Sequence, residues 1–292
     1  MRVVVAALAL VAAGGSVASG APRVEPQSLA FWDVRHGLVV GSEARGHRAV
    51  VLLTSDGGRT WRTIRRGRGP YAVAAVRGGT RGWIALPGAL LRTPDRGRTW
   101  STFSRARIVA PSFATPEDGW ALARGRLVAT RDGGVSWREL RQPCGRFIDP
   151  EPAIALATPE HGWVLCLGQP GAGQQLKALY ESRNGGLSWR LRSSNLFGRP
   201  RRGNLPASGY GDGISFLGDG RGWLAESRGA FYETRDGGTR WRALPISQPE
   251  VVEAHAAELL SARVGVALIF YSRRLAVTSD GGRTWRNVGR FG

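Results

Sequence analysis

The sequence predicts an all-β fold, a six-bladed β-propeller made of four-stranded antiparallel blades. An eight-residue motif close to Thr-x-Asp-Gly-Gly-x-Thr-Trp occurs six times along the chain of 292 residues. The tryptophans that end successive copies are 39, 37, 52, 52 and 44 residues apart. Four-stranded propeller blades repeat with a period of roughly 40–50 residues, so these spacings fit one blade per copy.

Each repeat contains four short segments with strand character. A Gly-Trp-type pair precedes each motif, with 18 to 27 residues from its glycine to the tryptophan of the motif. In the first repeat we expect strands at 29–32, 38–41, 50–54 and 60–64, with the motif as the turn between the last two. The six repeats are predicted over 28–66, 71–105, 108–143, 152–194, 211–245 and 251–291, within one propeller domain over 27–291.

The sequence leaves the closure of the ring open. The first repeat begins on its innermost strand and the last ends on its outermost strand, so no exchanged closing strand is visible. A closing strand supplied by residues 21–27 is one alternative. A seven-bladed ring, with a partial seventh blade inside the insertion at 193–212, is the other.

The acidic residue of each motif is predicted to build its own turn. A carboxylate or amide at this place accepts backbone N–H groups of the turn, and the second glycine permits a positive φ. The turn residues are Asp56, Asp95, Asp132, Asn184, Asp236 and Asp280. The asparagine in the fourth copy keeps the turn chemistry without the charge, which favours a structural role over catalysis or calcium binding. Ten of the 11 tryptophans occupy the motif or the Gly-Trp position, so we expect them in the core.

The first 20 residues are predicted to be a signal peptide. Arg2 is followed by an apolar run from Val3 to Ala13 and then by small residues up to Gly20. This order is typical of a secretory leader, and the run is shorter than the roughly 20 residues of a membrane span. We therefore expect a secreted or envelope-exposed protein without a transmembrane segment in its mature chain.

Cys144 and Cys166 are the only cysteines. An even number of cysteines in an exported chain favours one disulfide. A metal site is the alternative, but two thiolates need further ligands and the four histidines show no metal-ligand spacing. The sequence therefore predicts neither a metal nor a cofactor.

The chain is strongly basic, with 41 Lys and Arg against 22 Asp and Glu and a formal net charge of +19. Such a charge favours acidic partners and salt-dependent association. Export argues against nucleic acid as the partner. An envelope or secreted protein, an anionic polymer or acidic lipid headgroups remain as candidates, and we expect the chain itself to be monomeric.

The arginines gather in particular connections of the predicted blades. If the strands of a blade are named A to D from the inside outward, the A–B and C–D turns lie at one end, and the B–C and D–A connections lie at the other. The longest insertions, 168–175 and 193–212, belong to the second end, where binding loops are expected. The candidate basic face consists of Arg45, Arg48, Arg65, Arg66, Arg68, Arg105, Arg107, Arg124, Arg126, Arg146, Arg199, Arg201, Arg202, Arg228, Arg273 and Arg274. The alternative interpretation is a solvated rim in an arginine-rich protein.

The repeat resembles the Asp-box, or bacterial neuraminidase, repeats of sialidases, xyloglucanases and the sortilin ectodomain. With its His-Gly or Asp-Gly-Trp element ahead of Thr-x-Asp-Gly-Gly-x-Thr-Trp, it is most similar to the photosystem II stability/assembly factor family. The resemblance covers nearly all of 28–291. It implies a propeller fold and a chaperone-like, non-catalytic character.

A sialidase-like exo-glycosidase is the alternative function. Such an enzyme needs an arginine triad for a carboxylate, a Tyr–Glu nucleophile pair and an acid/base aspartate. The Arg-Ile-Pro motif that this resemblance would place ahead of the first Asp box is absent. We therefore predict a non-enzymatic, exported binding or assembly factor that presents an arginine-rich face to an acidic protein or polyanion.

Overall fold

The computed structural model describes residues 24–43, 48–69, 71–145, 152–195, 203–227, 231–244, 254–269 and 273–291. These residues form 24 β-strands. In this part of the chain, no helix is long and apolar enough to cross a membrane. The strands are β1 (Val24–Phe31), β2 (Gly37–Glu43), β3 (Arg48–Thr54), β4 (Arg62–Arg68), β5 (Ala72–Ala75), β6 (Gly82–Leu86), β7 (Ala89–Thr93), β8 (Ser101–Ser104), β9 (Val109–Phe113), β10 (Gly119–Ala123), β11 (Arg126–Thr130), β12 (Arg138–Glu139), β13 (Ala153–Leu156), β14 (Gly162–Leu167), β15 (Lys177–Ser182), β16 (Arg190–Ser194), β17 (Tyr210–Phe216), β18 (Gly222–Ser227), β19 (Tyr232–Thr234), β20 (Arg242–Ala243), β21 (Ala254–Leu259), β22 (Gly265–Ile269), β23 (Arg274–Thr278) and β24 (Arg286–Arg290).

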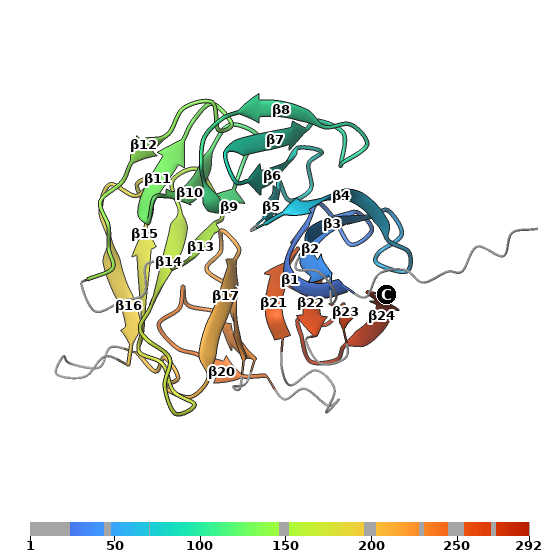
Figure 1. Cartoon of the computed structure of the whole chain (residues 1–292). Coiled ribbons are helices and arrows are strands. Elements are labelled where there is room, and N and C mark those ends of the chain that lie inside the picture. Colours follow the sequence, from blue (N-terminus) through green and yellow to red (C-terminus); the bar gives the residue numbers. More distant parts are fainter. Residues whose placement is uncertain are drawn as a thin grey trace, which may run out of the picture.

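The strands form six four-stranded antiparallel sheets, and in each sheet the strands follow one another in sequence order. We number these blades 1 to 6, from β1–β4 to β21–β24. Their innermost strands contact one another around a ring, and β1 contacts both β5 and β21 (Figure 1). The predicted six-bladed propeller is confirmed. The alternative of a seventh blade is wrong, because six blades already complete the ring.

The Gly-Trp element explains how successive blades pack. The glycine that begins each second strand lies against an aromatic ring, and a Cβ on Gly119 would come within 2.6 Å of Phe113. In β6 the glycine of this element is Gly82, and Trp83 follows it. Trp83 is fully buried and stacks on Phe113 of the next blade, with ring centroids 3.5 Å apart. Its indole N–H donates to the carbonyl of Gly133, inside the next Asp box, at 3.0 Å. The element therefore joins one blade to the following one.

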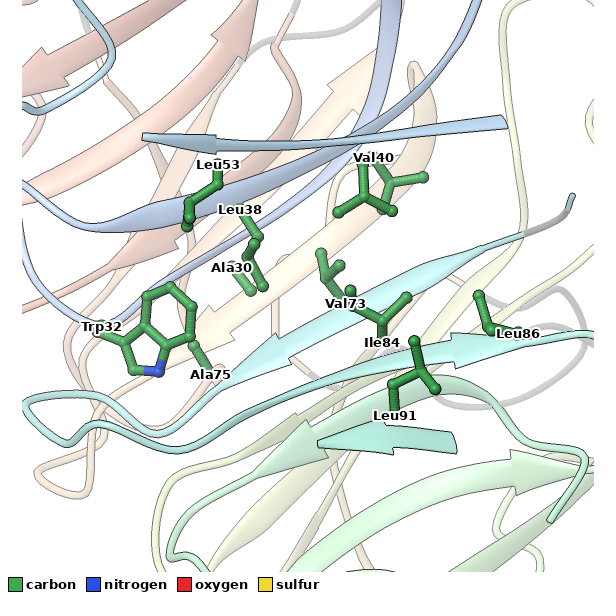
Figure 2. Packing of buried hydrophobic residues seen from close by; sticks show 11 residues of the cluster. Ala30, Trp32, Leu38, Val40, Leu53, Val73, Ala75, Ile84, Leu86 and Leu91 are labelled. Carbon is green, nitrogen blue, oxygen red and sulfur yellow. The ribbon is translucent and has the colours of Figure 1, made fainter. Parts of the chain in front are cut away.

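The core lies between the facing sheets of neighbouring blades. Figure 2 shows one such cluster, in which Leu38 and Val40 of blade 1 lie opposite Val73 and Ile84 of blade 2. Trp32 is the tryptophan outside the repeat pattern, and it is fully buried in this cluster. Six clusters of this kind repeat around the ring. Seven of the 11 tryptophans are buried in these clusters, as expected. The four others are half-buried at the cluster edges, and each ends an Asp box: Trp61, Trp100, Trp137 and Trp189.

The ring closes without an exchanged strand. Residues 24–27 extend β1, the innermost strand of blade 1, and β24 completes blade 6 from the C-terminal side (Figure 1). The prediction that residues 21–27 supply a separate closing strand is therefore wrong for residues 24–27. Residues 21–23 lie outside the described part of the chain. Blades 6 and 1 are held together by a shared apolar cluster and by a hydrogen bond of 3.3 Å from the Val24 N–H to the Phe291 carbonyl.

Candidate functional site

The two ends of the propeller are chemically different. The A–B and C–D turns, with every Asp box, lie at one end, which we call the Asp-box end. The B–C and D–A connections lie at the other, which we call the loop end. This division follows from the antiparallel A-B-C-D order of all six sheets.

At the Asp-box end the acidic side chains satisfy their own turns. The Asp56 carboxylate accepts hydrogen bonds from the Thr54 hydroxyl at 2.9 Å, the Thr60 N–H at 3.0 Å and the Thr60 hydroxyl at 2.6 Å. Burial alone would raise the pKa of Asp56, but these hydrogen bonds outweigh it and lower the pKa to about 2. The pKa of Asp132 and of Asp280 is lowered to about 2 in the same way.

Asn184 occupies the same geometry without a charge. Its side-chain oxygen accepts the Ser188 N–H at 2.9 Å, and its amide donates to the Ser188 hydroxyl at 2.8 Å. The box carboxylates thus have their lone pairs committed to turn donors. Their arrangement builds turns, as the sequence predicted.

The structure describes ten of the 16 arginines of the candidate basic face. Eight of them are exposed on blades 1, 2 and 3, and Arg273 and Arg274 are half-buried on blade 6. These four blades are consecutive in the ring. Outside the described residues lie Arg45, Arg146, Arg199, Arg201, Arg202 and Arg228.

Carboxylates neutralise three of the ten. Arg66 pairs with Glu43 at 2.9 Å, Arg126 with Glu139 at 2.5 Å, and Arg273 with Glu25 at 3.2 Å. Within the described part of the chain, no ion pair joins the following six: Arg48, Arg65, Arg68, Arg105, Arg107 and Arg124.

Strand register places arginines opposite one another on two neighbouring blades. Arg48 of β3 pairs with Arg68 of β4 in blade 1. Arg274 of β23 pairs with Arg290 of β24 at the equivalent place in blade 6. Like charges directly opposite in a sheet are destabilising. Arg290 was not among the predicted residues, because only the register of the third and fourth strands shows that it faces Arg274.

We call the charged side chains at the loop end of neighbouring blades 6 and 1 the basic rim. It carries six guanidinium groups and two carboxylates, so its charge is strongly positive. Its members are Arg48, Arg66, Arg68, Arg273, Arg274 and Arg290, with Glu25 and Glu43.

Arginines also occur at the Asp-box end, so their presence alone selects neither end. A cavity of about 320 Å³ between blades 5 and 6 is lined by Arg221, Arg235, Arg263 and Arg283. Two of these are paired, Arg221 with Asp219 at 3.2 Å and Arg235 with Glu233 at 3.5 Å. The distinguishing feature of the basic rim is therefore the direct opposition of like charges.

The two predicted insertions meet at the loop end of blades 4 and 5. The Gly209 N–H donates to the Gly173 carbonyl at 2.9 Å, and the Gln175 N–H donates to the Ala207 carbonyl at 3.2 Å. The Asn195 amide donates to the carbonyls of Gln175 and Pro206, each at 3.0 Å. Residues 168–176 and 206–209 thus form one hydrogen-bonded unit, which we call the platform. Asn204, earlier in the second insertion, instead bonds to Thr239 and Trp241 of the blade 5 Asp box.

A buried ion pair supports the platform. The Lys177 ammonium donates to Glu226 Oε1 at 2.5 Å and to the carbonyls of Ser208 and Gly209 at 2.9 and 3.2 Å. Both charged side chains are fully buried. Three acceptors match the three ammonium protons, which favours the charged form of the lysine. Burial nevertheless lowers the pKa of Lys177 and raises that of Glu226 to about 7.

The disulfide predicted between Cys144 and Cys166 is present. It ties the connection after β12 to β14, and so joins the passage between blades 3 and 4 to the second strand of blade 4. Among the described residues, no group of three or more His, Cys, Asp or Glu side chains is placed to hold a metal ion.

A cavity of about 620 Å³ runs along the axis between the innermost strands. All six blades contribute to its wall, which is rich in alanine, with Ala74, Ala155 and Ala256 among the lining residues. Arg77, Asp212 and Glu258 supply its charged groups. We call this cavity the central channel.

No family model matches the chain, and no curated protein matches it. Solved propeller structures do match. YCF48 from Cyanidioschyzon merolae is 17% identical with a TM-score of 0.53, over 93% of this chain and 88% of that one. YCF48 bound to D1 peptide is 18% identical with a TM-score of 0.53, over 91% of this chain and 82% of that one.

A glycoside hydrolase is similar to a comparable degree. The GH74 xyloglucanase from Xanthomonas campestris is 15% identical with a TM-score of 0.57, and the match covers 91% of this chain but only 47% of the enzyme. At these identities the likeness shows the fold alone. Because this fold carries both peptide binding and polysaccharide cleavage, the function has to be argued from the surfaces of this chain.

Proposed function

We propose that this chain is an exported, non-catalytic binding protein whose basic rim holds an acidic segment of a partner protein during that partner's assembly. The opposed pairs Arg48–Arg68 and Arg274–Arg290 carry the proposal. A fold gains nothing from placing like charges directly opposite one another at equivalent places on adjacent blades. An anionic partner offsets the repulsion and turns it into binding free energy, with guanidinium forks suited to carboxylates.

Three further observations support this proposal. The leader-like residues 1–20 and the disulfide fit an oxidising compartment outside the cytosol. The platform joins parts of two long connections of blades 4 and 5 by hydrogen bonds, and loops held on a rigid scaffold are common binding elements. A propeller of similar fold has been solved as "YCF48 bound to D1 peptide".

The test is a binding titration with a fluorescent peptide of ten alternating Asp and Glu residues. Wild-type chain is compared with Arg68→Thr/Arg290→Thr and with Arg62→Thr/Arg286→Thr. All four arginines are exposed on β4 and β24, so the two double variants lose the same charge from the same strands at opposite ends. We expect the first variant to weaken binding about tenfold or more, and the second by less than about threefold.

Salt dependence completes the test. Binding through the basic rim weakens as ionic strength rises from about 0.05 to 0.3 M, because exposed charges are screened over a Debye length of about 10 Å or less. Equal loss in both double variants would show that net charge alone attracts the peptide, and would contradict the proposal. Anionic vesicles and teichoic acid are titrated in parallel with the same double variants. If binding of either one depends more strongly on Arg68 and Arg290 than peptide binding does, that polyanion replaces the acidic protein as the proposed partner.

The alternative of a sialidase-like exo-glycosidase is tested on the same preparations. Release of product from a fluorogenic sialoside, abolished in Tyr210→Phe or Tyr232→Phe, would overturn the non-catalytic proposal. The Tyr210 hydroxyl accepts the Gly173 N–H of the platform at 3.1 Å, which supports a structural role for this side chain.

A further inference from the structure

One ring of side chains in the central channel has a single exceptional member. In every blade, one residue of the innermost strand pairs with the glycine that begins the second strand. The residue immediately before it in the sequence lines the channel. These six residues are Ala30, Ala74, Ser112, Ala155, Ser215 and Glu258. Five blades thus use a small side chain at this place, and blade 6 uses a glutamate.

The glutamate does more than the fold requires. Ser112 and Ser215 each accept a backbone N–H from the following blade, at 2.9 and 3.0 Å. Glu258 Oε2 makes the equivalent bond to the Phe31 N–H at 2.8 Å. A serine would therefore serve to join the blades. The second carboxylate oxygen of Glu258 has no hydrogen bond to any described residue.

A second exception comes from blade 2. In most blades, the second residue after the innermost strand has a side chain that accepts a backbone N–H of the A–B turn. Thr115 accepts the Glu117 N–H at 3.2 Å, and Thr158 accepts the His161 N–H at 3.0 Å. Blade 2 has Arg77 at this place, and its long side chain lines the channel instead.

Arg77 crosses the channel at the Asp-box end. Its two terminal nitrogens lie 3.5 Å from the Phe216 carbonyl of blade 5, at the outer limit of hydrogen bonding. Its Nε is buried without a partner among the described residues, and so is the hydroxyl of Ser28, which also lines the channel. Buried polar groups in proteins nearly always have partners, so these open donors point to a bound molecule or to ordered water.

Arg77 and Glu258 influence each other but are not joined. Burial raises the pKa of Glu258 to about 7, against the opposing effect of the Arg77 charge and the Phe31 hydrogen bond. Among the described residues, no ion pair within 4.0 Å links the two side chains. One ligand that carries both complementary charges could therefore pair with the two groups. Most of the other lining residues are apolar and many are alanines, with Ala72, Ala256 and Ile214 among them.

We propose that the Asp-box end of the central channel binds a small zwitterion of the α-amino acid class with an apolar side chain. Its carboxylate lies on the Arg77 guanidinium, its ammonium group lies on Glu258, and its side chain packs on the alanine-rich wall. The cavity of about 620 Å³ falls in the range of about 300–1,000 Å³ that is usual for small-molecule sites. The site shares no residue with the basic rim and stands independently of the proposed function.

The test is calorimetric titration of the purified chain with L-alanine, L-valine, L-leucine and L-phenylalanine. Each is compared with the acid that lacks its ammonium group and with the amine that lacks its carboxylate. We expect saturable binding of at least one amino acid, at least about tenfold tighter than either analogue.

Two variants test the proposed contacts. Each introduces the residue that other blades have at the equivalent position, so we expect both to fold. Glu258→Ser installs the side chain of blades 3 and 5, and Arg77→Thr installs the cap of blades 3 and 4. Each should weaken binding at least about tenfold, whereas Arg35→Thr, on the exposed A–B turn of blade 1, should leave it unchanged. Thermal unfolding of every variant verifies that it is folded.

The proposal is overturned if none of the four amino acids binds, which would assign the open donors to ordered water. It is equally overturned if an analogue with one charge binds as tightly as the amino acid, or if Glu258→Ser and Arg77→Thr bind like the wild type.

Discussion

The Asp-box end and the loop end of this propeller are built from the same 24 strands, yet they use charge in opposite ways. At the Asp-box end the aspartate of a box accepts hydrogen bonds from its own turn, as Asp56 does from Thr54 and Thr60. At the loop end of blades 6 and 1, arginines face arginines across the sheet. Chemistry that recurs in every repeat serves folding, and the departures from the repeat mark the places to look for function.

The largest effect is expected at the loop end, because its platform depends on one buried ion pair. Lys177→Met leaves Glu226 buried without its counter-ion and should reduce the free energy of unfolding by about 3–5 kcal/mol. The double variant Lys177→Met/Glu226→Met should recover most of this loss. Urea unfolding followed by tryptophan fluorescence measures both. A loss below about 1 kcal/mol in the single variant would show that the platform does not depend on this pair.

A smaller loss of unfolding free energy is expected when one Asp box is changed, because five further copies keep their hydrogen bonds. Asp56→Ala removes the acceptor of three hydrogen bonds and should cost about 1–2 kcal/mol. Asp56→Asn should cost much less, because Asn184 already fills this place in blade 4. The same urea experiment applies, and an equal loss in both variants would mean that the charge itself is needed.

Acid should weaken the Asp-box end selectively. The folded pKa of Asp56, Asp132 and Asp280 is about 2, below the ordinary value of 3.8. Their contribution to stability is therefore complete above about pH 4 and is lost as the pH falls through 2. Glu226 and Glu258, with a pKa of about 7, act in the opposite sense, because protonation between pH 7 and 4.5 favours the folded state.

Thermal unfolding between pH 7 and pH 2 checks this prediction. The midpoint should hold or rise slightly down to about pH 4.5 and then fall steeply. Asp56→Asn should make the acid limb shallower. A midpoint that declines steadily from pH 7 would contradict the assignment of the acid response to the boxes.

The smallest effect is expected at the basic rim itself. Arg68→Thr removes the charge opposite Arg48 and should stabilise the fold by about 0.2–1 kcal/mol, because like charges facing one another in a sheet repel. Arg62, on the same strand, lies opposite the uncharged Leu53. Arg62→Thr should therefore change the free energy of unfolding by less than about 0.3 kcal/mol. Destabilisation by Arg68→Thr would mean that the rim has a structural role.

Most of the architecture could be predicted from the sequence because the repeat is read from local signals. The turn motif and the Gly-Trp pair fix two of the three turns in each blade, and with them the antiparallel order. The first strand was predicted too short, at 29–32, and the structure extends it to Val24–Phe31. Pro26 and exposed polar residues hid this extension, and a register shift between Pro26 and Ser28 accommodates them.

The candidate site was predictable only in part. The loop end was located correctly by counting strands, but opposition of charges depends on register, so Arg290 was missed. The contact between residues 168–176 and 206–209 joins segments that are distant in the sequence, so no local sequence pattern predicts it. The channel glutamate had a signal in the sequence, since aligning the residues before each Gly-Trp element sets Glu258 against alanine or serine.

Site-specific photocrosslinking reports where on the propeller an acidic segment lies, so it tests binding at the basic rim itself. Benzoylphenylalanine is placed at position 68 at the loop end or at position 62 at the Asp-box end of the same strand. Because the substitution at position 68 removes one arginine of the basic rim, each chain is irradiated at a peptide concentration that saturates it. We expect a peptide adduct from position 68 and none above background from position 62. Equal adducts from both positions, or an adduct from position 62 alone, would contradict it.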